Sequence, residues 1–141
     1  MSPRLDDAPA RFGAARVARL ATTTEDGSPH LVPVVFAVVG ETLWSAVDAK
    51  PKSTNALRRL ANVAANPAVS LLVDHYDDDW ATLWWVRARG TGREVGDADE
   101  RGRAVALLRA KYPQYAHHGL DGPVLAVAVS SWRGWSATPP A

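Results

Sequence analysis

The pattern of apolar and polar residues predicts a chain made mainly of strands, with three helices among them. Apolar runs bounded by turn residues are typical of strands, and apolar residues spaced three or four apart are typical of helices. The predicted strands are 18–24, 30–39, 42–47, 68–74, 80–95 and 124–135, and the predicted helices are 8–19, 53–65 and 97–112. This α-β-β-β-α-β-β-α-β order has too few helices for a doubly wound parallel sheet. It favours an antiparallel barrel with peripheral helices.

Turn residues connect the first three predicted strands as hairpins. Asp26-Gly27 is a strong hairpin signal between two β-prone runs, and Gly40-Glu41 is a second tight turn. The strand between them, 30–39, is apolar on both faces. One face can line a barrel core, whereas the other needs a helix, a ligand or a second protein chain. Pro33 removes a donor from the ladder and predicts a bulge or an edge position.

Two lysines precede the second predicted helix. Lys50 and Lys52 lead from a strand end to Ser53, which is a good helix N-cap. The free N–H groups and the positive dipole end of that helix would lie beside the two cations. This combination is typical of an anion site, most naturally for phosphate. A solvated basic loop is the alternative interpretation.

The predicted strand 80–95 alternates between two kinds of side chain. Its odd positions from 85 to 93 are Trp85, Arg87, Arg89, Thr91 and Arg93, and the even positions between 84 and 92 are Trp84, Val86, Ala88, Gly90 and Gly92. The odd face is therefore cationic, and it is either a solvated strand face or part of a ligand site. The glycines on the other face permit tight packing or the close approach of a ligand. The tryptophans suit a stacked aromatic ligand, a protein interface or the core.

Composition excludes several classes of protein. The chain has 141 residues, 47% of them apolar, which predicts one globular domain over 1–141. The absence of Cys excludes disulfides and thiolate chemistry, and the net charge of +1 argues against a strongly basic nucleic-acid binder, with a local basic patch as the alternative. No apolar run has the length of a membrane span, and the acidic start lacks the pattern of a signal peptide, so we expect a cytoplasmic protein. The histidines have no metal-ligand spacing, and no acid, base or nucleophile stands out. This pattern is typical of a protein whose reactive atoms belong to a cofactor.

Three segments carry a family resemblance. Residues 18–36, ARLATTTEDGSPHLVPVVF, resemble the first hairpin of the split β-barrel flavin and deazaflavin enzymes, which include pyridoxamine phosphate oxidase and F420-dependent oxidoreductases. Residues 50–92, KPKSTNALRRLANVAANPAVSLLVDHYDDDWATLWWVRARGTG, and residues 131–137, SWRGWSA, resemble one F420-dependent branch of that group. The resemblance implies a six-stranded antiparallel split β-barrel. It also implies a homodimer with two cofactors at the subunit interface.

The resemblance also implies the site residues. His30, Val32 and Pro33 would lie beside the deazaflavin ring and its side chain. The phosphodiester would be held by Lys50, Lys52, Ser53 and Asn55, and Trp80 of the partner subunit would close the site. The anion site predicted from the residues and the phosphate site implied by the family therefore fall on the same segment.

The implied activity is hydride transfer between the reduced deazaflavin C5 and an electrophilic carbon of a quinone, an enone or a tetrapyrrole. F420 is favoured over FMN because the leading cations are lysines, which act as point charges along a long anionic tail rather than as bidentate forks. The proton donor is not assigned by the sequence. Two alternatives remain: an FMN-dependent oxidase or reductase on the same barrel, and a non-enzymatic protein that carries a deazaflavin or haem.

Overall fold

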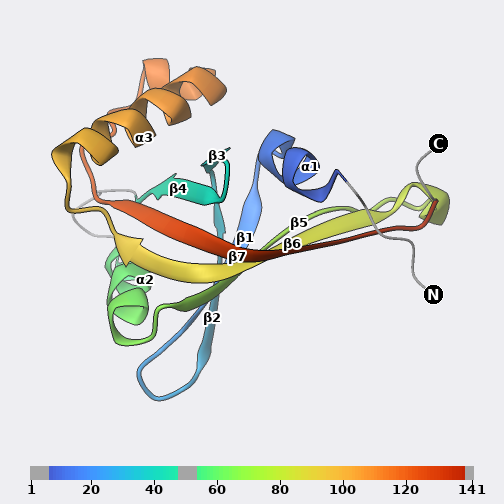
Figure 1. The fold of residues 1–141 in the computed structure, drawn as a ribbon, viewed down its shortest axis with the longest axis horizontal. Helices are drawn as coiled ribbons and strands as arrows, with labels where there is room; N and C mark the ends of the chain where they lie inside the picture. The colour runs from blue at the N-terminus through green and yellow to red at the C-terminus, as the bar shows by residue number, and fades with distance from the viewer. Residues whose placement is uncertain (1–6, 48–53, 139–141) are drawn as a thin grey trace.

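A computed structural model describes residues 7–47 and 54–138, without the side chains of residues 54–56. Within these ranges there are three α-helices and seven strands (Figure 1). The helices are α1 (Ala8–Ala14), α2 (Thr54–Ala65) and α3 (Ala98–Lys111), with 3-10 turns η1 (Trp80–Thr82) and η2 (Pro113–Ala116). The strands are β1 (Ala18–Thr23), β2 (Pro29–Val34), β3 (Ala37–Val39), β4 (Thr42–Ala46), β5 (Ala68–His75), β6 (Trp84–Glu94) and β7 (Val124–Ser136).

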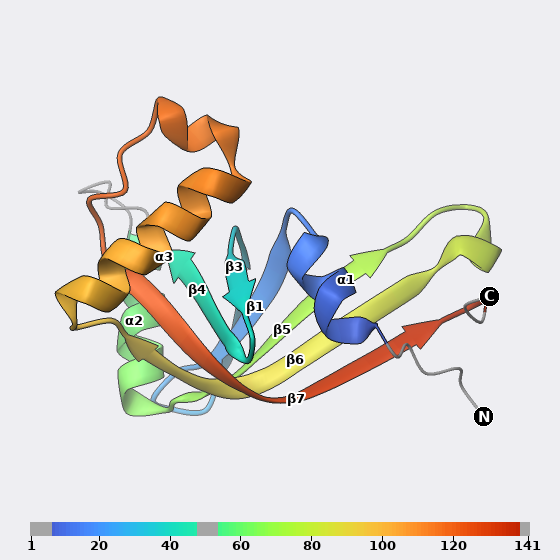
Figure 2. The ribbon, with the colours of Figure 1, turned by 45° about the horizontal axis from the view of Figure 1, so that its top comes forward.

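All seven strands belong to one antiparallel sheet with the order β2-β1-β5-β6-β7-β4-β3. The sheet is strongly curved but not closed, because β2 and β3 are its two edges (Figure 2). This confirms the predicted mainly-β, split-barrel class. The turn glycines Gly27 and Gly40 have positive φ values of 91° and 59°, as the two predicted hairpin turns require. Pro33 lies on an edge strand, as predicted.

The structure has seven strands where the sequence predicts six, because the predicted strand 30–39 breaks at Val35–Phe36. Phe36 is fully buried, and its backbone bonds to α3 and to the residue after it instead of to a neighbouring strand. Its N–H donates to Tyr112 Oη at 3.1 Å, and its carbonyl accepts from Tyr112 Oη and Lys111 Nζ, both at 3.0 Å. These side chains satisfy the backbone groups that a continuous ladder would have paired. Nothing in the local sequence of 30–39 indicates partners so distant along the chain.

Two other predicted boundaries differ from the structure. The first helix ends at Ala14 instead of residue 19, because β1 already begins at Ala18 and pairs with β2 and β5. The predicted strand 80–95 begins with the 3-10 turn η1, which is capped by the Asp79 carboxylate accepting from Ala81 N–H. The predicted third helix and last strand correspond closely to α3 and β7.

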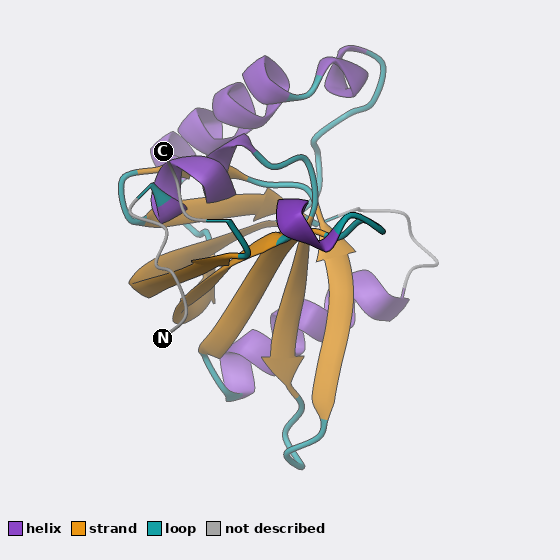
Figure 3. Ribbon diagram, turned by 90° about the vertical axis from the view of Figure 1, so that its right-hand side faces the viewer, coloured by secondary structure: helices purple, strands orange, loops and turns teal. Residues whose placement is uncertain are grey.

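Helices cover the concave inner face of the sheet and one part of its outer face (Figure 3). On the inner side, α1 inserts Phe12 against Phe36 and Trp132, and α2 packs Val63 against Gly92. A Cβ at Gly92 would lie 3.1 Å from Val63, so the predicted tight packing at this glycine is confirmed. On the outer side, α3 covers β3 and β4.

An ion pair and a hydrogen bond connect α3 to the sheet. Arg93 on β6 makes a bidentate ion pair with Glu100 at 2.9 and 2.7 Å, and Trp44 Nε1 donates to the same carboxylate at 3.0 Å. These donors lower the pKa of Glu100 from 4.5 to about 2, with the Arg93 hydrogen bond the largest cause. At the other end of α3, burial lowers the pKa of Lys111 to about 8. None of the helices in the described ranges is long and apolar enough to cross a membrane.

Candidate functional site

The edge strand β2 directs alternate side chains to opposite faces of the sheet. His30 and Val32 are half-buried on the inner face, and Val34 behind them is buried. Leu31 and Pro33 lie on the outer face, where Leu31 is 66% exposed. The three β2 residues that the resemblance implies for the ring therefore divide between two faces, two inward and one outward. Leu31 lies on the second apolar face of this strand, for which the sequence predicts a helix, a ligand or a second chain, and none of the described residues covers it.

A small polar cluster lies behind His30. Thr22 on β1 is directly opposite His30 in the β1–β2 pair, and its hydroxyl accepts from Asn62 Nδ2 of α2 at 3.1 Å. Thr22 and Asn62 are both buried among apolar residues. The Nδ1 atom of His30 is buried and has no hydrogen-bond partner among the described residues. Buried ring nitrogens without a partner are rare, so this atom marks His30 as more than a packing residue.

The predicted anion site falls largely outside the described residues. Lys50, Lys52 and Ser53 lie there, and Asn55 is described only as part of the backbone of α2. The helix itself begins at Thr54, directly after the lysine segment, and its first turn contains no acidic residue. An anion at this end would therefore experience the helix dipole without a carboxylate from the first turn to oppose it.

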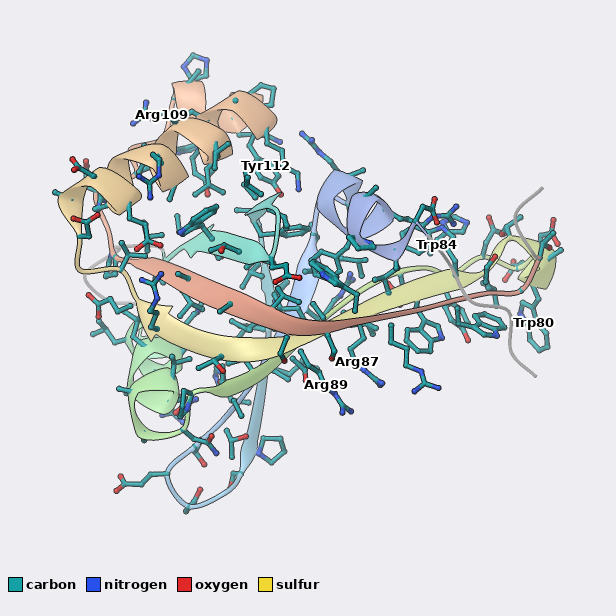
Figure 4. All side chains as sticks on the ribbon, in the orientation of Figure 1. Trp80, Trp84, Arg87, Arg89, Arg109 and Tyr112 are labelled. Carbon is teal, nitrogen blue, oxygen red and sulfur yellow. The ribbon has the colours of Figure 1, made fainter. Side chains whose placement is uncertain are left out.

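Trp80 lies at the tip of a long arm formed by β5, β6 and the end of β7 (Figures 1 and 4). Its side chain is 73% exposed, as is that of Tyr76 on the other side of the same turn. Within one chain the tip is far from β2, on the opposite side of the arm's base (Figure 1). One protomer therefore does not bring Trp80 together with His30.

The outer face of β1, β2, β5, β6 and β7, here called the outer sheet face, combines aromatic and cationic side chains. Trp85 of β6 pairs with Trp135 of β7. Two residues further along β6, Arg87 pairs with Arg133. Figure 4 shows Arg87 and Arg89 projecting from the same side of β6, as their predicted shared face requires. A pocket of about 220 Å³ lies on this face along β5 and β6, and it is lined by Leu72, Asp74, Tyr76, Trp85 and Arg87.

Charge on the outer sheet face is mostly positive. Arg19, Arg87 and Arg133 lie in one cross-strand row that includes Leu72, and Arg89 lies two residues further along β6. Asp74 is the acidic residue of the pocket. Asp74 is 3.8 Å from Arg19, and Arg87 lies over the Trp85 ring at 5.5 Å. No ion pair in the described part of the chain involves Arg87, Arg89 or Arg133. Arg93, which the sequence places on the same face, instead pairs with Glu100 beyond the β-bulge between Arg89 and Gly90.

The described residues contain binding features rather than an acid–base or metal centre. In residues 7–47 and 54–138, no three His, Asp or Glu side chains are grouped as metal ligands. Sequence reasoning missed Thr22 and Asn62, although the period-two pattern of β1 would have placed Thr22 on the buried face beside Leu20. It also missed Trp135 and Tyr76, whose positions depend on strand pairing between distant segments.

The open antiparallel barrel and its uncovered outer face define a split-barrel protein. The sequence matches the family described as pyridoxamine 5'-phosphate oxidase over residues 5–136, and the chain belongs to this family. A search of curated protein sequences gave no match.

Several solved structures share the fold. A conserved hypothetical protein from Mycobacterium tuberculosis is 23% identical with a TM-score of 0.76, over 96% of this chain and 87% of that one. An FAD-binding protein from Mesorhizobium loti is 21% identical with a TM-score of 0.71, over 95% and 96% of the two chains. The haem storage protein of Vibrio cholerae is 16% identical with a TM-score of 0.72, over 94% and 97%. At these identities the similarity shows the fold alone. Proteins with this fold bind different ligands, because one of these structures is an FAD-binding protein and another is a haem storage protein.

Proposed function

We propose that this protein is a cytoplasmic F420-dependent oxidoreductase that transfers a hydride between the deazaflavin and a small organic acceptor such as a quinone, an enone or a tetrapyrrole. The observation that carries the proposal is the start of α2, where the helix follows two lysines and has no acidic residue in its first turn. An extended anionic tail suits these separated point charges. Family membership and the FAD-binding relative support a flavin-like ring beside the barrel.

When bound, the deazaflavin would supply the hydride. The protein would hold the anionic tail at Lys50, Lys52, Ser53 and Asn55. It would orient the ring against His30, Val32 and Pro33. Orientation and exclusion of water are the main contributions of a protein whose cofactor carries the chemistry.

Equilibrium titration of the purified protein with oxidised F420, FMN and haem under identical salt tests this proposal. Low-micromolar F420 binding, about −8 kcal/mol, with much weaker FMN binding is the expected result. Preference for FMN would overturn the F420 proposal in favour of a flavin enzyme. A haem complex with a Soret band and no turnover with any acceptor would indicate a binding protein, as the haem storage relative suggests.

A charge variant tests the anion site directly. Lys52→Ala is expected to weaken F420 binding by about 1–3 kcal/mol, because a charge-assisted phosphate contact is lost. Arg109→Ala is the matched control, since it removes one exposed cation from α3, on the far side of the sheet from β2 (Figure 4). Equal affinities for both variants and the natural protein would make Lys52 part of a solvated basic loop.

Within this proposal the chain is a homodimer with the cofactor at the interface, and the outer sheet face is the contact surface. Its exposed Leu31, the tryptophan pair and the pocket beside them suit a protein partner. Four arginines on this face match the acidic tip 77–79, which adjoins the exposed Trp80 on the same arm. In a two-fold symmetric dimer the same contact occurs twice. The arginines of each chain can therefore contact the acidic tip of the other chain.

Sedimentation velocity of a matched pair of variants tests the dimer. Leu31 and Leu57 are both 66% exposed, but Leu31 lies on the outer sheet face and Leu57 on α2. Leu31→Asp is expected to give monomers, and Leu57→Asp to remain dimeric like the natural protein. A natural protein that sediments as a monomer at all concentrations would overturn the homodimer, and dissociation by Leu57→Asp alone would move the interface to α2.

A further inference from the structure

Three polar side chains lie together on the inner face of β1 and β2, within an otherwise apolar layer. Thr22 is 2% exposed and Asn62 is 6% exposed, and Asn62 Nδ2 donates to Thr22 Oγ1 at 3.1 Å. His30 is the cross-strand partner of Thr22. The neighbouring inward residues on these strands, Leu20 and Val34, are buried and apolar. Thr22 and Asn62 are hydrogen-bonded to each other, as buried polar side chains usually are.

The hydrogen-bonding capacities of Thr22 and His30 are complementary. A threonine hydroxyl has one proton and two lone pairs, and Thr22 uses one lone pair to accept from Asn62. Among the described residues its proton has no acceptor, and the buried Nδ1 of His30 has no donor. Directly paired residues in an antiparallel ladder have Cβ atoms about 5 Å apart. The structure does not contain a hydrogen bond between Nδ1 and the Thr22 hydroxyl, so the relay requires the imidazole ring to turn toward Thr22.

The side-chain amide of Asn62 determines which acceptor is left for the hydroxyl proton of Thr22. Because its N–H group donates to Thr22, the threonine hydroxyl keeps its proton for an acceptor other than Asn62 Nδ2, and the cross-strand residue His30 is the candidate acceptor. A histidine whose Nδ1 accepts a hydrogen bond has its proton on Nε2 when it is neutral.

We propose that Asn62, Thr22 and His30 form a polar relay that fixes neutral His30 with its proton on Nε2, so that this residue donates a hydrogen bond to an acceptor oxygen or ring nitrogen of the ligand beside β2. This inference rests on the proposed function for one point, which is that the ligand is the cofactor or its substrate. Thr22 and Asn62 are positioning residues, because they act through His30.

Side-chain 15N NMR of the protein without ligand, at about pH 8 where histidine is neutral, tests the relay independently of activity. The expected signature is a protonated Nε2 and an unprotonated Nδ1 whose chemical shift shows an accepted hydrogen bond. Thr22→Val should remove the hydrogen-bond shift at Nδ1, and Thr22→Ser should restore it because the hydroxyl is kept. Thr23→Val is the matched control, since Thr23 is the next residue on the opposite face of β1. Identical His30 signals in the Thr22→Val variant and the natural protein would overturn the relay.

Asn62→Asp is the sharper variant, because it reverses the relay without removing Thr22. A carboxylate only accepts, so Thr22 must donate its proton to residue 62 and offer a lone pair to His30. The expected result is a shift of the His30 proton from Nε2 to Nδ1. Retention of the proton on Nε2 would overturn the relay, and this result decides the question if the valine variant does not fold.

Ligand binding provides the second readout. Thr22→Val should weaken F420 binding about three- to tenfold, the equivalent of one hydrogen bond, whereas Thr23→Val should leave it unchanged. If F420 does not bind the natural protein, the proposed cofactor fails while the NMR signature still stands. If F420 binds equally to Thr22→Val and the natural protein, the donor role of His30 is overturned while the cofactor stands.

Discussion

The two ends of the sheet use the same kinds of side chain in different ways. At the end covered by α3, Trp44 is buried and donates to Glu100, and Arg93 forms a bidentate pair with the same carboxylate. Along the arm and the outer sheet face, Trp80 is 73% exposed, and Arg89 has no ion pair within the described chain. Tryptophan and arginine therefore stabilise the fold at one end and remain available for a ligand or a second chain at the other.

The boundary between these two ends is the β-bulge between Arg89 and Gly90. A Cβ placed on Gly90 would lie 2.1 Å from the carbonyl oxygen of Ala128, which is backbone and has no flexible end to move aside. Gly90→Ala is the change with the largest expected effect. It should lower the free energy of unfolding by about 3 kcal/mol, because the β6–β7 ladder must open to admit the methyl group. Urea denaturation measures this loss.

Gly102→Ala is the matched control for that experiment. Gly102 lies in the exposed part of α3, and a Cβ there meets nothing within 4 Å. Alanine should stabilise the helix by up to about 1 kcal/mol, because glycine is the poorer helix former. If both glycine variants have the stability of the natural protein, the tight approach of β6 and β7 is not a constraint on this fold.

The ion pair of the α3 end is the next target, because its contribution depends on pH. Glu100→Gln keeps an acceptor for Trp44 but loses the charge that Arg93 contacts, and it should cost about 1–2 kcal/mol at pH 7. The folded pKa of Glu100 is about 2 and its ordinary value is 4.5. The unfolded chain therefore binds the proton first as pH falls. The stabilisation is complete above about pH 4.5 and is lost progressively toward pH 2.

Denaturation of both proteins across this pH range measures the difference. The stability difference between the natural protein and Glu100→Gln should shrink as the pH falls from 4.5 toward 2. A difference that stays constant over this range would mean that the Glu100 carboxylate is not selectively stabilised in the folded state.

The sequence predicts the fold better than it predicts the site, and the reason is physical. Strand alternation and turn glycines are local, so the hairpins at Gly27 and Gly40 and the inward pattern of β6 follow from the residues themselves. The break at Phe36 depends on Lys111 and Tyr112, which are about 75 residues away and give no local signal. The Asn62–Thr22 contact likewise exists only after α2 has packed on β1. The lysine segment follows from the sequence as a hypothesis, and it lies outside the described residues.

The smallest effect is expected for Trp80→Phe, which is compared with the same substitution at Trp44. Trp80→Phe should change the free energy of unfolding by less than about 0.5 kcal/mol, since the side chain is exposed at the tip of the arm and packs little of its surface within one chain. Trp44→Phe should cost about 1–3 kcal/mol, because it replaces a buried indole by a smaller ring and removes the hydrogen bond to Glu100. Denaturation must be measured at a concentration where the natural protein is monomeric, so that an interface does not contribute. A cost at Trp80 equal to that at Trp44 would mean that the arm tip is held by its own chain, and the division between a stabilising end and an interacting end would then be wrong.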